Sequence, residues 1–227
     1  AMLESDLGKL FPGTIAKSYQ FIELSQIDAE HSTHVEFFRH PMIGSWPFST
    51  AEQGWPVADC TAEGLSATLA IHHSGLVKPA IDEQLIKQAV DIILSYQNTD
   101  GGWATYELSR APKWLEKLNP SEVFADIMID YSWTECTAAC VISLLEIQET
   151  YPGFKNSEIR KAISAGLNFI LGQQKPDGSW YGGWAVCFTY ATWFAVEAFS
   201  KAKGKGYHDD QVLADCITKA CAFLVGK

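Results

Sequence analysis

The chain has 227 residues, of which 47% are hydrophobic and 12% aromatic, so it is long enough to bury a substantial core. Its formal net charge of −10 argues against a nucleic-acid partner, because phosphate backbones are bound by clustered Lys and Arg. No apolar run reaches the roughly 18 residues of a membrane-spanning helix, and the first residues lack the basic and apolar regions of a secretory signal.

Residues 1–55 are predicted to be an irregular N-terminal segment, because prolines and polar stretches interrupt them; one short helix is expected near residues 15–24. From residue 56 to residue 227, apolar residues recur at three- and four-residue steps, which indicates helices. No segment alternates as a strand does, so we expect an all-α fold built from helix hairpins. The predicted helices cover residues 61–74, 81–97, 121–131, 134–151, 157–174, 187–202 and 209–225.

A repeated motif divides this helical region into units. "IILSYQNTDGGW" at 92–103 and "FILGQQKPDGSW" at 169–180 each run from an apolar helix through Gln and an Asp-Gly turn to Trp. We expect the Gln to bond free backbone groups of the neighbouring unit and the Trp to stack over the turn. A third unit is interrupted at 219–227. Because arrays of hairpins need neighbours, we expect the chain to be part of a longer array.

Several motifs point to one family. The two Gln-to-Trp motifs resemble the QW repeats of the triterpene cyclases, and "VADCTAE" at 57–63 resembles the catalytic-acid motif of the oxidosqualene cyclases. Longer segments resemble the lanosterol-forming members of that family, in the same order. They are "WPFSTAEQGWPVADCTAE", "DGGWATYE", "LNPSEVFADIMIDYSWTECT" and "DGSWYGGWAVCFTYATWF". The resemblance implies an α/α-barrel (an α-α toroid), incomplete in this chain, with residues 56–227 as part of its catalytic domain.

The resemblance also implies an acid. Asp59 would protonate an epoxide, Cys60 and Cys136 would hydrogen-bond its carboxyl, and Glu63, one helical turn later, would return the proton through water. Burial raises a carboxyl pKa, whereas a helix start lowers it, so burial must dominate if Asp59 is to stay protonated. The related squalene–hopene cyclases carry D-x-D-D where this chain has Val-Ala-Asp-Cys, which favours an epoxide substrate over squalene.

Four aromatic residues match family positions that line the cyclisation cavity, where their faces stabilise carbocations. These are Phe48, Tyr106, Phe124 and Trp184. The alternative for all four is an ordinary place in the core. The family's histidine partner of the tyrosine, at the position of Tyr106, has no counterpart in this chain.

Simpler structural roles remain open for the other candidates. Asp59 and Glu135 could each cap a helix, and Cys60 and Cys136 could be small core residues. The remaining thiols are expected in the core, at 140, 187, 216 and 221. The pair His72–His73 is expected at a solvated helix end, because adjacent helical side chains diverge and make a poor metal site.

The implied reaction cyclises (3S)-2,3-oxidosqualene to a tetracyclic triterpene such as lanosterol, with no metal and no organic cofactor. The implied partners are this small substrate, a membrane and the remainder of the cyclase chain, with no nucleic acid. The family implies a peripheral, monotopic place on the cytoplasmic face of the endoplasmic reticulum or on lipid droplets, although this piece alone is expected to be soluble.

Three other functions remain open. The first is a related cyclase that makes a protosterol. The second is the β subunit of a protein prenyltransferase, another α/α barrel, but the zinc site it needs lacks a suitable His here. The third is a non-catalytic helical interaction module.

Overall fold

The computed structural model describes residues 2–5, 7–37, 39–122, 126–184 and 186–226, and these residues are helical without a β-strand. The short helix α1 (Leu7–Leu10) and the longer α2 (Pro12–Ser25) precede three hairpins. The hairpins are formed by α3 (Ala58–Ser74) with α4 (Glu83–Ser95), α5 (Thr134–Thr150) with α6 (Asn156–Gln173), and α7 (Cys187–Ala202) with α8 (Asp210–Val225). The 3₁₀ helices are η1 (Met2–Glu4), η2 (Ala51–Gln53) and η3 (Lys113–Leu118).

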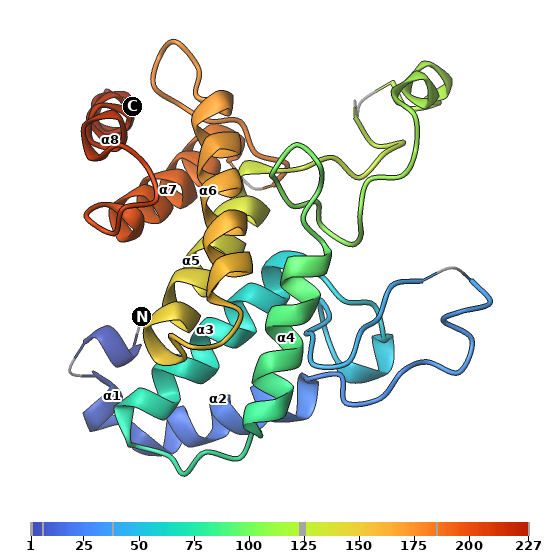
Figure 1. The fold of residues 1–227 in the computed structure, drawn as a ribbon, viewed down its shortest axis with the longest axis vertical. Helices are drawn as coiled ribbons and strands as arrows, with labels where there is room; N and C mark the ends of the chain where they lie inside the picture. The colour runs from blue at the N-terminus through green and yellow to red at the C-terminus, as the bar shows by residue number, and fades with distance from the viewer. Residues whose placement is uncertain (1, 6, 38, 123–125, 185, 227) are drawn as a thin grey trace.

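The hairpins stack in two layers. Helices α3, α5 and α7 pack side by side, and their partners α4, α6 and α8 lie outside them (Figure 1). Helix α5 is the centre of the core, with buried residues along almost its whole length, because α3 and α7 cover its two sides and α6 its back. Hairpins in an inner and an outer layer form the α/α toroid architecture that the family resemblance implied. Since hairpins repeat in one direction, α3, α5 and α7 all begin at the same end of the stack.

The repeated turns join each hairpin to the next. The Gln97 side chain donates to the carbonyl oxygen of Gly101 at 2.9 Å and to that of Ala162 in α6 at 2.9 Å. The fully buried Trp103 donates its indole N–H to the Ile93 carbonyl at 2.6 Å. The expected bonding by Gln is therefore confirmed, and Trp103 is buried and bonded to the preceding helix.

The second turn repeats these contacts. Gln174 donates to Gly178 at 3.1 Å and to Cys216 in α8 at 3.0 Å, and Trp180 donates to Ile170 at 2.6 Å. Gly178 has a φ of +90°, and a Cβ there would lie 2.4 Å from the Lys219 carbonyl oxygen. Only glycine allows this turn to approach the next outer helix so closely.

A third copy of this turn lies in the N-terminal segment, where no sequence motif marks it. Gln26 donates to the Gly44 carbonyl at 2.8 Å, and the Trp46 indole donates to the Ile22 carbonyl at 2.8 Å. The Gln and the Gly are 18 residues apart here, against four in the turn after α4. The inserted loop hides the motif from any pattern of fixed spacing.

Two other expectations differ from the structure. The helix predicted over 121–131 is wrong: the described residues of that segment are not helical, and residues 123–125 lie outside them. Pro120 precedes the segment, and Asp126 has a φ of +55°, which interrupts a right-handed helix. The helix expected near 15–24 is present but starts earlier, at Pro12, because proline suits the first turn.

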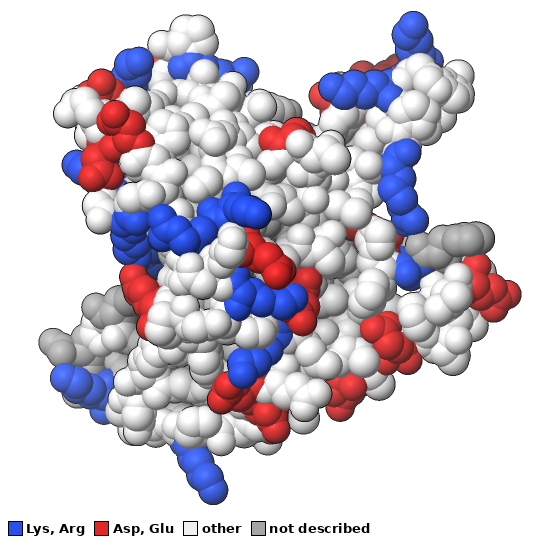
Figure 2. Space-filling view, viewed as in Figure 1, with Lys and Arg blue, Asp and Glu red and all other residues white. Residues whose placement is uncertain are grey.

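The outer surface carries charges of both signs. In Figure 2 the Lys and Arg side chains are interspersed with Asp and Glu over the face formed by α4 and α6. Ion pairs such as Lys87–Glu83 and Lys155–Asp91, at 2.5 and 2.9 Å, account for part of this mixture. Mixed charge of this kind is typical of a solvated face.

Candidate active site

Asp59 lies in the first turn of α3, at the end of the stack where α3, α5 and α7 begin. The N-cap of α3 is Val57, which makes no side-chain cap bond, so the capping role considered for Asp59 is wrong. The Asp59 Oδ1 instead accepts the N–H of Cys60 at 2.8 Å. Asp59 therefore sits inside the helix, with its carboxyl against the first turn.

Burial decides the proton affinity of Asp59. Desolvation raises the pKa of its carboxyl, and the nearby charge of Asp130 raises it further. Hydrogen bonds from the Cys60 N–H, from the Cys60 thiol and from the N–H of Asp59 itself lower this pKa, but they are outweighed. A carboxyl in this setting keeps its proton at a higher pH than a solvated one, as a Brønsted acid requires.

Three neutral thiols surround the start of α3. Burial, and then the charge of Asp59, raises the pKa of Cys60 to about 12. Burial and the same charge also raise the pKa of the fully buried Cys136 well above its usual value. Cys140, expected only in the core, is buried and donates its thiol to the Ala58 carbonyl at 3.7 Å. None of the six cysteines, all among the described residues, forms a disulfide, and Cys221 is exposed, so its expected core position is wrong.

Glu63 follows Asp59 on α3, but its side chain is exposed. Its pKa is raised by partial desolvation, then by the charges of Glu197 and Asp59. A carboxyl with access to solvent, one turn from the half-buried acid, is well placed to exchange protons with water.

Two carboxyls beside this site, the half-buried Asp130 and the fully buried Glu135, were not predicted as functional residues. Desolvation raises the pKa values of Asp130 and Glu135. Burial also raises the pKa of the Tyr190 phenol, with the charges of Asp59 and Glu135 adding to the effect. Asp130, Glu135 and Tyr190 thus lie within electrostatic reach of the acid. No local motif distinguishes them, because their burial depends on elements distant in the sequence.

Asp130 fixes the backbone that carries Tyr106. Its Oδ1 accepts the Thr105 N–H at 3.1 Å, and its Oδ2 accepts the Tyr106 N–H at 2.7 Å. The Thr105 carbonyl in turn accepts the Ala58 N–H at 2.7 Å, at the start of α3. This chain of bonds holds Tyr106 beside the segment that bears Asp59.

The side chain of Arg39 stacks on an aromatic ring beside Tyr106. The Arg39 guanidinium lies 3.3 Å from the ring centroid of Trp55, which meets the Tyr106 ring edge-on at 5.8 Å between centroids. Arg39 also pairs with Glu107, the residue after Tyr106. The loop before α3 and the loop after α4 are thereby joined.

The four aromatic residues predicted to line a cavity are not buried where the structure describes them. Phe48, Tyr106 and Trp184 are exposed, with 76%, 39% and 57% of their surface accessible. Phe124 lies outside the described residues. The three described rings belong to loops near the starts of α3, α5 and α7, so they occur at the same end of the stack as Asp59.

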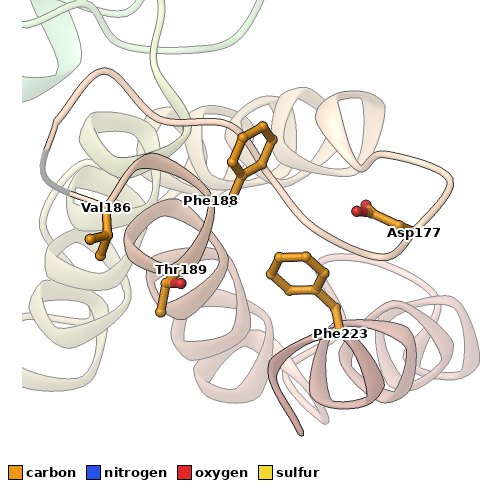
Figure 3. A pocket seen from close by; sticks show the side chains of 5 residues that line it. All are labelled: Asp177, Val186, Phe188, Thr189 and Phe223. Atoms are coloured by element: carbon orange, nitrogen blue, oxygen red, sulfur yellow. The ribbon is translucent and has the colours of Figure 1, made fainter. Parts of the chain in front are cut away.

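One cavity lies away from these residues. About 300 Å³ of space lies between the start of α7, the end of α8 and the turn at Asp177, with Phe188 and Phe223 on its walls (Figure 3). Its lining includes none of the predicted site residues. Among the described residues, no group of three or more His, Cys, Asp or Glu could hold a metal ion, and none of the helices has the length and apolar character to cross a bilayer.

Comparison with known proteins agrees with the QW-like turns and the acid motif. The model of the squalene–hopene cyclase C-terminal domain family matches residues 1–225. The chain belongs to this family. Within it, the chain resembles the oxidosqualene cyclases: it is 43% identical to lanosterol synthase of Mus musculus, over 94% of this chain and 29% of the relative.

It is also 42% identical to cycloartenol synthase of Dictyostelium discoideum, over 87% of this chain and 28% of the relative. A solved structure, the apo type II terpene cyclase MstE from Scytonema, aligns with a TM-score of 0.49 and 19% identity, over 90% of this chain and 53% of that one. The chain thus spans less than a third of the length of these two curated relatives.

Proposed function

We propose that the chain supplies the acid-bearing part of an oxidosqualene cyclase acting on (3S)-2,3-oxidosqualene. Asp59 donates its proton to the epoxide oxygen as the C–O bond opens. The double bonds of the polyene then close four rings in succession, and a proton is lost at the end. The overall reaction is an isomerisation, because the proton gained at the oxygen is matched by the proton lost from carbon.

The observation that carries this proposal is the environment of Asp59. Its carboxyl is desolvated enough to raise its pKa although it accepts a helix N–H, and the thiols near it are neutral. In this proposal Cys60 and Cys136 orient the carboxyl, and the exposed Glu63 returns the proton through water. Phe48, Tyr106, Phe124 and Trp184 present their ring faces to the successive cations.

The test uses the 227-residue chain alone and the same chain in place of the matching segment of mouse lanosterol synthase. Both are incubated with (3S)-2,3-oxidosqualene, and products are analysed by mass spectrometry. We expect the chimera to form a tetracyclic product and its Asp59→Asn variant to form none. An active Asp59→Asn chimera would show that this carboxyl is not the acid.

Among possible products we propose lanosterol, on the resemblance of the segments around Phe48 and Trp184. Cycloartenol and protosterols are the other outcomes. A second chimera, built in the Dictyostelium cycloartenol synthase, shows whether this chain or the host enzyme determines the product. Lanosterol from both chimeras supports the proposal, and a product that follows the host contradicts it.

We also propose that the complete enzyme associates peripherally with the endoplasmic reticulum or with lipid droplets, because its apolar substrate partitions into such phases. Cell fractionation of the chimera tests this: an enzyme found wholly in the soluble fraction contradicts the proposal.

A further inference from the structure

Glu135 is a buried carboxyl that the proposed mechanism does not use. It is the second residue of α5, and only 1% of its surface is accessible. Its Oε1 accepts the N–H of Gly183 at 2.6 Å, whereas its buried Oε2 has no hydrogen-bond partner among the described residues. The N-cap of α5 is Trp133, so the capping role considered for Glu135 is wrong.

The turn at residues 182–184, which bonds to Glu135, lies very close to the helices beside it. A Cβ at Gly182 would lie 2.8 Å from the Glu135 Oε2 and 2.9 Å from the Ala191 Cβ. A Cβ at Gly183 would lie 3.4 Å from the Trp133 ring. Glycine at position 182 therefore lets this turn lie directly on the starts of α5 and α7, whereas a Cβ at position 183 would make only an ordinary contact.

This turn leads into the acid site. Trp184, the residue after Gly183, is one of the proposed cavity aromatics. The backbone N–H of Trp184 favours the charged form of Glu135 and so opposes the desolvation that raises the pKa of this carboxyl. The charge of Asp59 reaches Glu135 as well, which places the turn, the carboxyl and the acid in one neighbourhood.

We propose that Glu135 is a positioning residue, whose carboxyl fixes the 182–184 turn and thereby the orientation of Trp184 toward the reacting polyene. The contact itself depends only on the structure, and its consequence for product formation rests on the proposed function. Glu135 transfers no proton to substrate. Its role is to accept the Gly183 N–H, which would otherwise lose its acceptor at the start of α5.

The first test concerns the contact and uses Glu135→Gln and Glu135→Leu in the 227-residue chain. Gln keeps an oxygen acceptor of the same reach, whereas Leu fills similar space without one. We expect hydrogen exchange at Gly183 to be about tenfold or more faster in the Leu variant and close to wild type in the Gln variant. Glu149→Leu, an exposed position on the same helix, is the matched control and should leave this exchange unchanged. Equal protection of Gly183 in the Leu variant and the wild type would overturn the proposal.

The second test concerns the consequence and uses the same variants in the mouse chimera. We expect both Glu135→Leu and Trp184→Ala to shift the product mixture toward prematurely terminated or rearranged triterpenes, with the Gln variant retaining the wild-type mixture. A purely structural role would lower the total yield without changing the ratio of products. A Gln variant as inactive as Asp59→Asn would instead show that the Glu135 proton is used, and would overturn the positioning role.

The two tests separate the possible failures. If the wild-type chimera forms no cyclic product, the proposed function fails while the exchange experiment still decides the contact. If the chimera is active and the Leu variant gives the wild-type product ratio, the positioning role fails and the proposed function stands.

Discussion

The side-chain amide of Gln97 donates a hydrogen bond to the backbone carbonyl of Ala162, 65 residues later in the chain, at 2.9 Å. The same side chain closes its own turn through Gly101. One amide therefore ends α4 and attaches that turn to the outer helix of the next hairpin. Gln174 makes the corresponding bond to Cys216, so the stack is joined by repeated polar contacts as well as by apolar packing.

We expect Gln97→Leu to lower the free energy of unfolding by about 1 to 3 kcal/mol, because two carbonyl groups lose their donor at a partly buried position. Urea unfolding of the 227-residue chain, followed by circular dichroism, measures this change. Gln84→Leu, on the exposed side of α4, is the matched control. A variant at position 97 as stable as the control would show that the link between hairpins adds nothing to stability.

Gly101→Ala is predicted to be more disruptive than its small change in volume suggests. Gly101 has a φ of +89°, and a Cβ there would lie 2.6 Å from the Ala165 carbonyl oxygen. Backbone strain and the clash together should lower the free energy of unfolding by about 2 kcal/mol or more.

Gly172→Ala should have the opposite effect, since a Cβ in this position of α6 meets nothing within 4 Å. We expect that change to stabilise by about 0.5 to 1 kcal/mol. Thermal unfolding of both variants should therefore shift in opposite directions, and a shared direction would contradict the account.

Much of the fold was predictable because its determinants are local. The Gln-to-Trp turns at 97–103 and 174–180 place donor, glycine and indole at fixed spacing, so the repeat is visible in the letters. The turn from Gln26 to Trp46 makes the same contacts but contains an inserted loop, so only the three-dimensional structure reveals it. The predicted helix over 121–131 failed because apolar periodicity takes no account of Pro120 or of the backbone at Asp126.

The candidate site was predictable to a smaller extent. Asp59 was identified through the motif around it, which is contiguous. The importance of Asp130 and Glu135 comes from burial by segments distant in the sequence: the 105–106 loop against Asp130 and the 182–184 turn against Glu135. A single carboxylate beside a helix start gives no sequence signal of such an environment.

Tyr19 should be a strong determinant of stability. Its hydroxyl accepts the N–H groups of Ala80 and Ile81, both at 3.0 Å, and bonds to the His72 Nε2 at 2.6 Å. Tyr19→Phe leaves two amides without an acceptor, so we expect a loss of about 2 to 4 kcal/mol. Chemical denaturation measures the loss. Tyr181→Phe, at an exposed position, controls for removal of a hydroxyl, and equal effects of the two changes would contradict this role.

The last prediction concerns pH and Asp59. Because burial raises its pKa in the folded chain, Asp59 contributes stability that is fully present below the unfolded-state pKa of about 4. That contribution is lost as the pH rises through the folded-state pKa, since the charged form is then buried. Asp59→Asn retains an oxygen for the Cys60 N–H but has no charge to bury. We therefore expect the variant to be more stable than wild type at pH 7, although it is inactive in the chimera.

The measurement is the free energy of unfolding of the 227-residue chain from pH 4 to pH 8. The Asn variant should lose less stability than wild type over this range. Asp82→Asn, at the exposed start of α4, is the matched control, because it removes the same charge while Asn remains a good helix cap. If Asp59→Asn and wild type show parallel pH profiles, the carboxyl is solvated in the folded chain, and the argument for Asp59 as a desolvated acid fails with it.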